Sequence, residues 1–156
     1  MTMVKYIGVR RIPTFVIVLS TTLVLFAGLY LASLREETAA QDGKLQLLSK
    51  ISPDLFLGIG IPVMVLEALF WTVAFVELTA KFTSLWLGAF AGVLSYGVAY
   101  HWNGGLISIF VSGWIALVLN VSYVLLRSRS RRVAVLSTVF QKVVFIIWVA
   151  AALYAT

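Results

Sequence analysis

The stretch from Asp54 to Lys81, DLFLGIGIPVMVLEALFWTVAFVELTAK, decides the fold class of this chain. Its apolar length suits a membrane-spanning helix, because a helix rises about 1.5 Å per residue and a bilayer core is about 30 Å thick. Near its middle it carries a carboxylate, Glu67. A charge at that depth costs roughly 2.5–3.5 kcal/mol on insertion scales. We therefore expect the folded protein to offset the cost of burying Glu67.

The composition indicates a multi-pass integral membrane protein. The 156 residues are 62% hydrophobic and 12% charged, whereas a soluble domain is about half apolar and a quarter charged. The net charge is +6, but the basic residues stand at the ends of apolar blocks, which favours a topological role over nucleic-acid binding. The sequence has no cysteine, which excludes disulfides and thiolate metal sites.

The apolar blocks predict an all-α fold, a single domain over residues 1–156 built as a bundle of five transmembrane helices. The first block is longer than the roughly 7–15 apolar residues of a signal peptide, so we interpret it as a retained span. The predicted spans cover about residues 14–34, 54–80, 84–100, 106–126 and 133–154, with a short interfacial helix over 44–51.

The start of the second span has a clear helix signal. Ser52 can cap the helix, Pro53 suits its first position, and Asp54 complements the helix dipole. Further along, Pro62 lacks the N–H that would bond to the carbonyl of Gly58, so we predict a kink there.

The basic residues predict the orientation of the bundle. A cytoplasmic N-terminus and an outer C-terminus place most of them on the inner side, as the positive-inside rule requires. We therefore expect a protein of the plasma membrane. The inner segments hold Lys5, Arg10, Arg11, Lys81, Arg127, Arg129, Arg131 and Arg132, against Arg35, Lys44 and Lys50 outside.

Small residues recur every four positions on two consecutive spans, which predicts a closely packed antiparallel hairpin. Lipid tails give helices no hydrophobic reason to associate, so small side chains that let backbones approach are typical of such contacts. The two stripes are Ser84, Gly88 and Gly92 on one span, and Ser108, Ser112, Ala116 and Asn120 on the next.

Four polar residues fall deep in the predicted spans: Glu67, Asn120, Gln141 and Lys142. Lys142 and Glu67 differ by only about 6 Å in depth, so they would form an ion pair if their helices touch. Such a pair is either a structural bridge, with Gln141 or Asn120 bonding its remaining atoms, or part of an ion or substrate pathway. A third interpretation leaves Glu67 protonated and lets Lys142 extend toward the interface.

Glu77 and Lys81, nearer the inner edge, stand four residues apart on one helix and predict a local surface pair. At the outer side His101 is the single histidine of the chain. One histidine cannot build a bis-histidine haem site or a three-histidine zinc site, so we expect no metal and no cofactor bound by this chain alone.

These features favour a non-catalytic integral subunit that packs within and stabilises a larger membrane complex, such as a respiratory or metal-dependent enzyme. We expect membrane lipids and other membrane subunits as its partners. The alternative is a homo-oligomeric channel or small transporter with Glu67 in its pathway. A third hypothesis is an intramembrane enzyme that uses His101 at the outer face.

Overall fold

The computed structural model describes residues 3–33, 50–99, 101–102 and 105–154, and within these ranges every regular element is a helix. The all-helical class predicted from the sequence is confirmed over these ranges. Of the predicted interfacial helix over 44–51, residues 44–49 lie outside the described ranges. Four helices are long and apolar enough to cross a membrane, over Pro13–Tyr30, Pro53–Ala80, Ser108–Arg127 and Arg131–Ala151, and a shorter apolar helix covers Leu85–Ala99.

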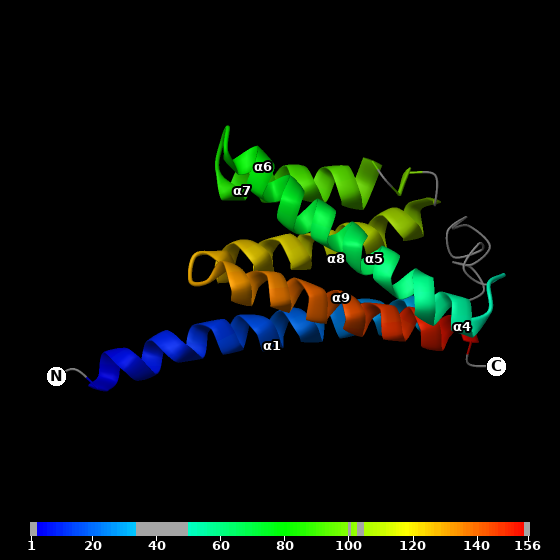
Figure 1. Ribbon diagram of the computed structural model, residues 1–156, viewed down its shortest axis with the longest axis horizontal. Helices are drawn as coiled ribbons and strands as arrows, with labels where there is room; N and C mark the ends of the chain where they lie inside the picture. Colours follow the sequence, from blue (N-terminus) through cyan, green and yellow to red (C-terminus); the bar gives the residue numbers. More distant parts are fainter. Residues whose placement is uncertain (1–2, 34–49, 100, 103–104, 155–156) are drawn as a thin grey trace.

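The first helix, α1 (Met3–Ser33), begins well before the predicted start of the first span at residue 14. The basic N-terminal segment therefore belongs to the helix. Pro13 lies inside α1, where it removes one backbone hydrogen bond. The membrane-length part of α1 packs along α8 and α9 (Figure 1).

The second span begins as predicted. Ser52 has an extended backbone and its Oγ accepts a hydrogen bond from Leu55 N at 3.3 Å, while Pro53 opens the helix. The span then alternates between α-helical and π-helical turns. Its segments are α4 (Pro53–Leu55), η1 (Phe56–Gly60), α5 (Ile61–Ala68), η2 (Leu69–Ala74) and α6 (Phe75–Ala80).

The two π-helical segments widen the second span on either side of α5. The amide of Ile61 bonds to the carbonyl of Phe56, and that of Phe75 to Phe70, each five residues back. The first widened turn directly precedes Pro62. In a regular α-helix the ring of a proline clashes with the carbonyl four residues back, and its nitrogen has no hydrogen to donate. Local π turns of this kind are one way in which a membrane helix accommodates a proline.

The remaining chain forms a hairpin and a final helix. Ser84 caps α7 (Leu85–Gly92), which continues as the π-helical η3 (Val93–Ala99). Gly105 has a φ of +78°, a conformation that favours glycine, where the chain turns into α8 (Gly105–Arg127). A turn then leads into α9 (Arg131–Tyr154).

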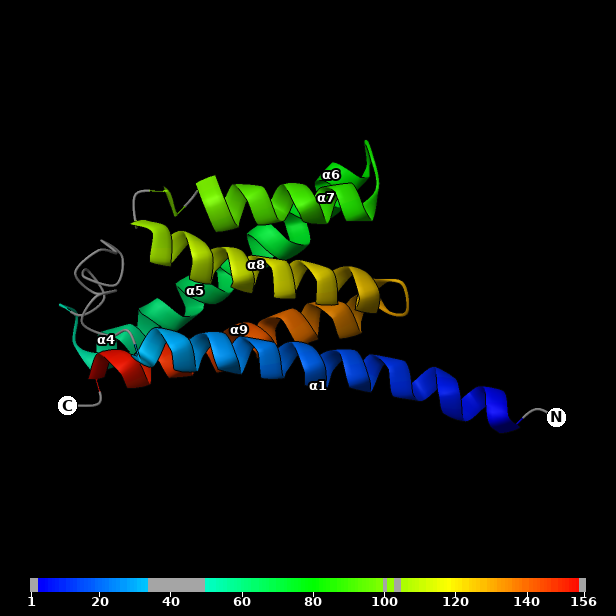
Figure 2. The ribbon, with the colours of Figure 1, turned by 180° about the vertical axis from the view of Figure 1, so that it is seen from behind.

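Helix α8 is the buried centre of the bundle. It contacts α1, α9, η2, α7 and η3, and 61% of its span is buried. The second span crosses the bundle obliquely, from α9 at its start to α7 at its end, and only 17% of it is buried (Figures 1 and 2). The span that carries Glu67 therefore lies at the periphery.

Apolar packing joins the helices in two clusters. The larger one lies between α1, α5, α8 and α9 and contains Val24, Ala27, Ala68, Val111, Ile115, Val118, Leu119, Phe145 and Val149. The smaller one lies at the end where α6 and α8 finish and contains Val76, Tyr123, Leu126 and Ala134.

Helices η3 and α8 approach each other very closely. A Cβ added to Gly97 would lie 2.6 Å from the Cα of Gly113. Ser112 Oγ donates to the Gly97 carbonyl at 2.8 Å across the same contact. The hairpin therefore depends on a bare backbone at Gly97, as small-residue contacts between membrane helices generally do.

We predict that Gly97→Ala destabilises the protein by about 1–3 kcal/mol, because the new methyl group must push two backbones apart. Gly58→Ala is the matched control, since a Cβ at Gly58 meets nothing within 4 Å. Equilibrium unfolding in mixed micelles, followed by circular dichroism, measures both variants. Equal stability of the two variants would contradict the close contact.

Candidate functional site

The most deeply buried cation of the described chain is Lys142 on α9, whose exposed fraction is 2%. Its Nζ donates to the hydroxyl of Tyr96 on η3 at 3.0 Å. The same Nζ lies 5.5 Å from the centre of the Tyr96 ring and 5.4 Å from that of Phe145. A hydroxyl and two ring faces thus stabilise the ammonium where water cannot.

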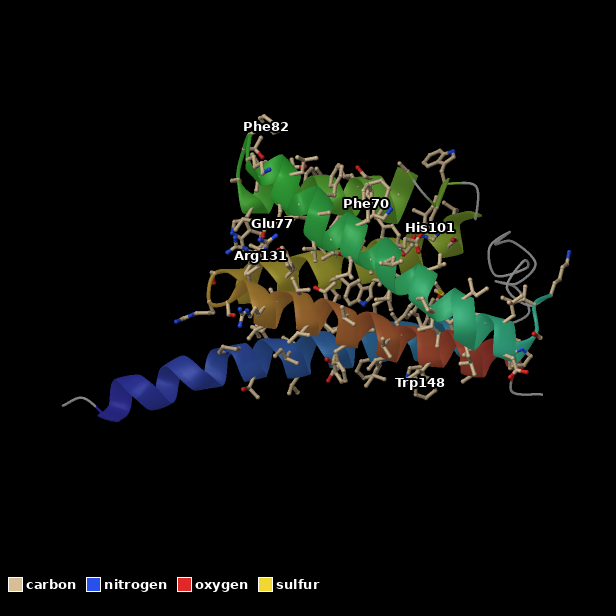
Figure 3. The ribbon with its side chains drawn as sticks, viewed as in Figure 1. Phe70, Glu77, Phe82, His101, Arg131 and Trp148 are labelled. Atoms are coloured by element: carbon tan, nitrogen blue, oxygen red, sulfur yellow. The ribbon has the colours of Figure 1, made fainter. Side chains whose placement is uncertain are left out.

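Tyr96 connects Lys142 to the turn between η3 and α8. Its ring meets the His101 ring edge-to-face, with 5.2 Å between centroids. His101 Nδ1 lies 3.5 Å from Ser108 Oγ, at the limit of a hydrogen bond. His101 is partly exposed, and Figure 3 shows it near the start of α8. The polar groups therefore extend from the buried lysine to the end of the bundle.

Glu67 lies on α5 with its surface partly exposed. Helix α5 packs against α9, which carries Lys142. The helix contact that an ion pair would need is thus present. The pairing of Glu67 with Lys142 itself stays a prediction.

Gln141, next to Lys142, is the centre of a separate hydrogen-bond network. Its Nε2 donates to Ser20 Oγ at 2.6 Å and to Ser137 Oγ at 2.9 Å, and its Oε1 accepts from Ser122 Oγ at 3.1 Å. The amide is fully buried and joins α1, α8 and α9 at one point. Gln141 therefore satisfies hydroxyls of three helices and does not serve the predicted ion pair.

Asn120 is a fully buried amide on α8. Its Nδ2 donates to the Ala116 carbonyl at 2.8 Å, while its Oδ1 has no hydrogen-bond partner among the described residues. A Cβ at Gly92 would lie 2.9 Å from that oxygen. Gly92 thus makes room for the amide, and the unsatisfied oxygen costs stability.

At the end of α6 the predicted local pair of Glu77 with Lys81 is wrong. Glu77 instead bonds to two residues of α8, accepting from the Tyr123 hydroxyl at 2.6 Å and forming an ion pair with Arg127. Lys81 is exposed. A fixed guanidinium and hydroxyl across a helix contact hold the carboxylate better than a flexible lysine on the same helix.

The first small-residue stripe contacts the second span. A Cβ at Gly88 would meet the carbonyl of Val76 at 2.8 Å, and one at Gly92 would lie 3.2 Å from the Trp71 carbonyl. Ser84 is exposed and caps α7 by accepting from Leu87 N. This stripe therefore contributes a cap and a close contact with α6 and η2.

The second stripe lies inside the bundle, on α8. Ser108, Ser112 and Ala116 are buried. Ser112 Oγ donates both to the Ser108 carbonyl at 2.6 Å and to Gly97 across the hairpin. The crossing point with η3 is set by Gly97 and Gly113, two positions outside the predicted stripes.

Several residues of these networks were not predicted from the sequence. Tyrosines and serines in an apolar span are ordinary lipid-compatible residues when they stand alone. The signal that could have found them is position, since Tyr96 and Tyr123 both lie at depths where a charged residue on another span needs a partner. The missed residues are Ser20, Tyr96, Ser122, Tyr123, Arg127 and Ser137.

No family model, curated protein or solved structure matches the chain. Over the described ranges no three or more His, Asp or Glu side chains gather as metal ligands. The expectation that this chain alone binds no cofactor stays a prediction.

We predict that Gln141→Leu destabilises the protein by roughly 1–3 kcal/mol, because it leaves buried hydroxyls of three helices without their partner. The matched control is Thr22→Val, which removes an exposed hydroxyl that bonds only within α1, to Val18 O. Thermal unfolding in detergent compares the two variants. The network has no structural role if both unfold like the parent protein.

Proposed function

We propose that this chain is a non-catalytic integral membrane subunit that packs within and stabilises a larger membrane complex. One contrast supports the proposal: the deepest polar side chains are closed off inside the bundle, while the second span leaves most of its surface uncovered. A subunit needs a rigid internal framework and a free helix surface, and both are present.

The closed interior argues against a pathway through the bundle at Lys142 and Gln141. Their exposed fractions are 2% and 0%, and each is engaged in hydrogen bonds with other helices. An ion pathway or reaction centre has to admit water or substrate to such groups. Their arrangement fits interhelical connection.

The open surface of the second span fits a neighbouring helix. Its outward side chains include Leu57, Val63, Leu66 and Phe70, each more than half exposed. Glu67 stands beside them and keeps part of its surface open. A neighbouring subunit would remove this part of the carboxyl-bearing side chain from lipid, where a charge is costly.

The alternative, a channel or small transporter, has one observation in its favour. Lys142, Tyr96 and His101 follow one another from the middle of the bundle to its outer end. With Glu67 on the adjacent α5, such a series of polar groups resembles the start of a proton or ion pathway.

We predict that the protein, purified in mild detergent at native expression, is found by native mass spectrometry with other polypeptides at fixed stoichiometry. Leu66→Trp, on the open surface, should weaken that assembly by steric conflict, whereas Ile147→Trp, exposed on α9, should not. A homogeneous oligomer of this chain alone would contradict the subunit proposal. It would favour the transporter if Glu67→Gln also abolished flux in liposomes.

We further propose five crossings with the N-terminus cytoplasmic and the C-terminus outside. The Glu77–Arg127 ion pair supports placing the ends of α6 and α8 on one side. The bond from the Tyr154 hydroxyl to the Ile51 carbonyl, at 3.2 Å, supports placing the end of α9 beside the start of the second span.

The third crossing is the short one. The eight residues of α7 and the seven of η3 rise about 22 Å, less than the roughly 30 Å core. The chain still has to return between α6 and α8, because these two helices finish at the same end. Local thinning of the bilayer accommodates so short a crossing, which would leave the turn around His101 open to water on the outer side.

The cysteine-free sequence allows a direct test of this topology. We predict that Trp102→Cys reacts with an impermeant maleimide on intact cells, and that Ser128→Cys reacts only after the membrane is opened. Both positions are exposed in the fold, so a cysteine that fails to react on intact cells is shielded by the membrane and not by the protein. The parent protein is the unlabelled control, and the reverse pattern would invert the orientation.

A further inference from the structure

Two turns lie at the end of the bundle where α6 and α8 finish (Figures 1 and 2). The α6–α7 turn contributes one exposed basic residue, the α8–α9 turn contributes another, and the first two residues of α9 contribute two more. Figure 3 shows Glu77 and Arg131 together at this end. We call the exposed cations the basic rim: Lys81, Arg129, Arg131 and Arg132.

Arg127 is separate from the basic rim because it is already paired. Its guanidinium bonds to both carboxylate oxygens of Glu77, which also accepts from Tyr123. Among the described residues, Glu77 is the one carboxylate at this end, and Arg127 neutralises it. Arg131 also lies near this carboxylate (Figure 3), so a single acidic side chain of the described residues stands against the five cations at this end.

The surroundings of the basic rim match the headgroup level of a membrane. Phe82 follows Lys81 directly and is 83% exposed, and Trp86, in the first turn of α7, is 55% exposed. Exposed aromatic side chains beside cations are typical of the membrane interface. Helix α9 also begins here, capped by Ser130, and its N-terminal dipole adds to the positive potential.

We propose that the basic rim binds the phosphate headgroup of anionic membrane lipids. The attraction is charge complementarity, to which each basic residue near an anionic surface adds roughly a fivefold gain in affinity. Arginine, which supplies three of the four cations, binds phosphate oxygens in a two-pronged geometry. The Glu77–Arg127 pair joins α6 to α8 and so fixes both turns at the same end of the bundle.

The test titrates the intact protein in neutral detergent with phosphatidylglycerol or phosphatidylcholine and counts bound lipids by native mass spectrometry. We expect phosphatidylglycerol to bind preferentially. The triple variant Arg129→Gln, Arg131→Gln, Arg132→Gln should bind it on the order of 100-fold more weakly. Lys50→Gln, an exposed cation at the opposite end, should bind it like the parent protein.

Three results would overturn the proposal: an unchanged affinity of the triple variant, an equal loss in Lys50→Gln, or equal binding of the two lipids by the parent protein.

A competition experiment with inorganic phosphate distinguishes a lipid headgroup from a free phosphate ion. We expect no displacement of the lipid by phosphate at equal concentration, because the free ion lacks acyl chains beside Phe82. Displacement would assign the basic rim to a free phosphate ion. Unfolding temperatures within a few degrees of the parent show that each variant is folded.

Discussion

A polar group in the hydrocarbon layer is costly unless it finds a partner within the protein, and this constraint organises the bundle. Lys142 donates a hydrogen bond to a tyrosine hydroxyl and lies over two aromatic rings, and Gln141 is hydrogen-bonded to three serines. In water such bonds contribute little, since the unfolded chain makes equivalent ones. In lipid the alternative is an unsatisfied group that costs several kcal/mol, so these contacts determine which helices lie together.

The same requirement explains why α8 is central and the second span peripheral. Helix α8 carries Ser112, Asn120, Ser122 and Tyr123 around its circumference, so its neighbours contact polar groups on several sides. The second span offers three carboxylates and otherwise apolar or small side chains. Its end at Glu77 is joined to α8 by an ion pair. Elsewhere it packs on α9 through a few buried residues and leaves its other side open for lipid or a neighbouring protein.

The sequence predicts the membrane class and the starts of the later helices well. It predicts the hydrogen-bond and ion-pair partners of the polar side chains poorly. Apolar blocks and the Ser52 cap reflect local physics, so they are readable without the fold. The partner of Glu77 is not local: sequence spacing favours Lys81, and the fold supplies Arg127. The π-helical turns in η2 and η3 also shift the side chains that follow them around the helix axis. A four-residue repeat counted from Ser84 into η3 no longer marks one face, which is why Gly97 escaped the first predicted stripe. Gly113 lies on α8, next to Ser112 of the second stripe.

Helix α9 follows the other helices along the chain, and its buried amide and ammonium have consequences for biogenesis. As an isolated segment it would enter the bilayer with a lysine near its middle, at a cost of roughly 2.5–3.5 kcal/mol. By the time it emerges from the ribosome, Ser20, Tyr96 and Ser122 are already in the membrane. Helices α1, η3 and α8 thus offer hydrogen-bond partners to the polar side chains of α9, and these partners would assist the insertion of α9.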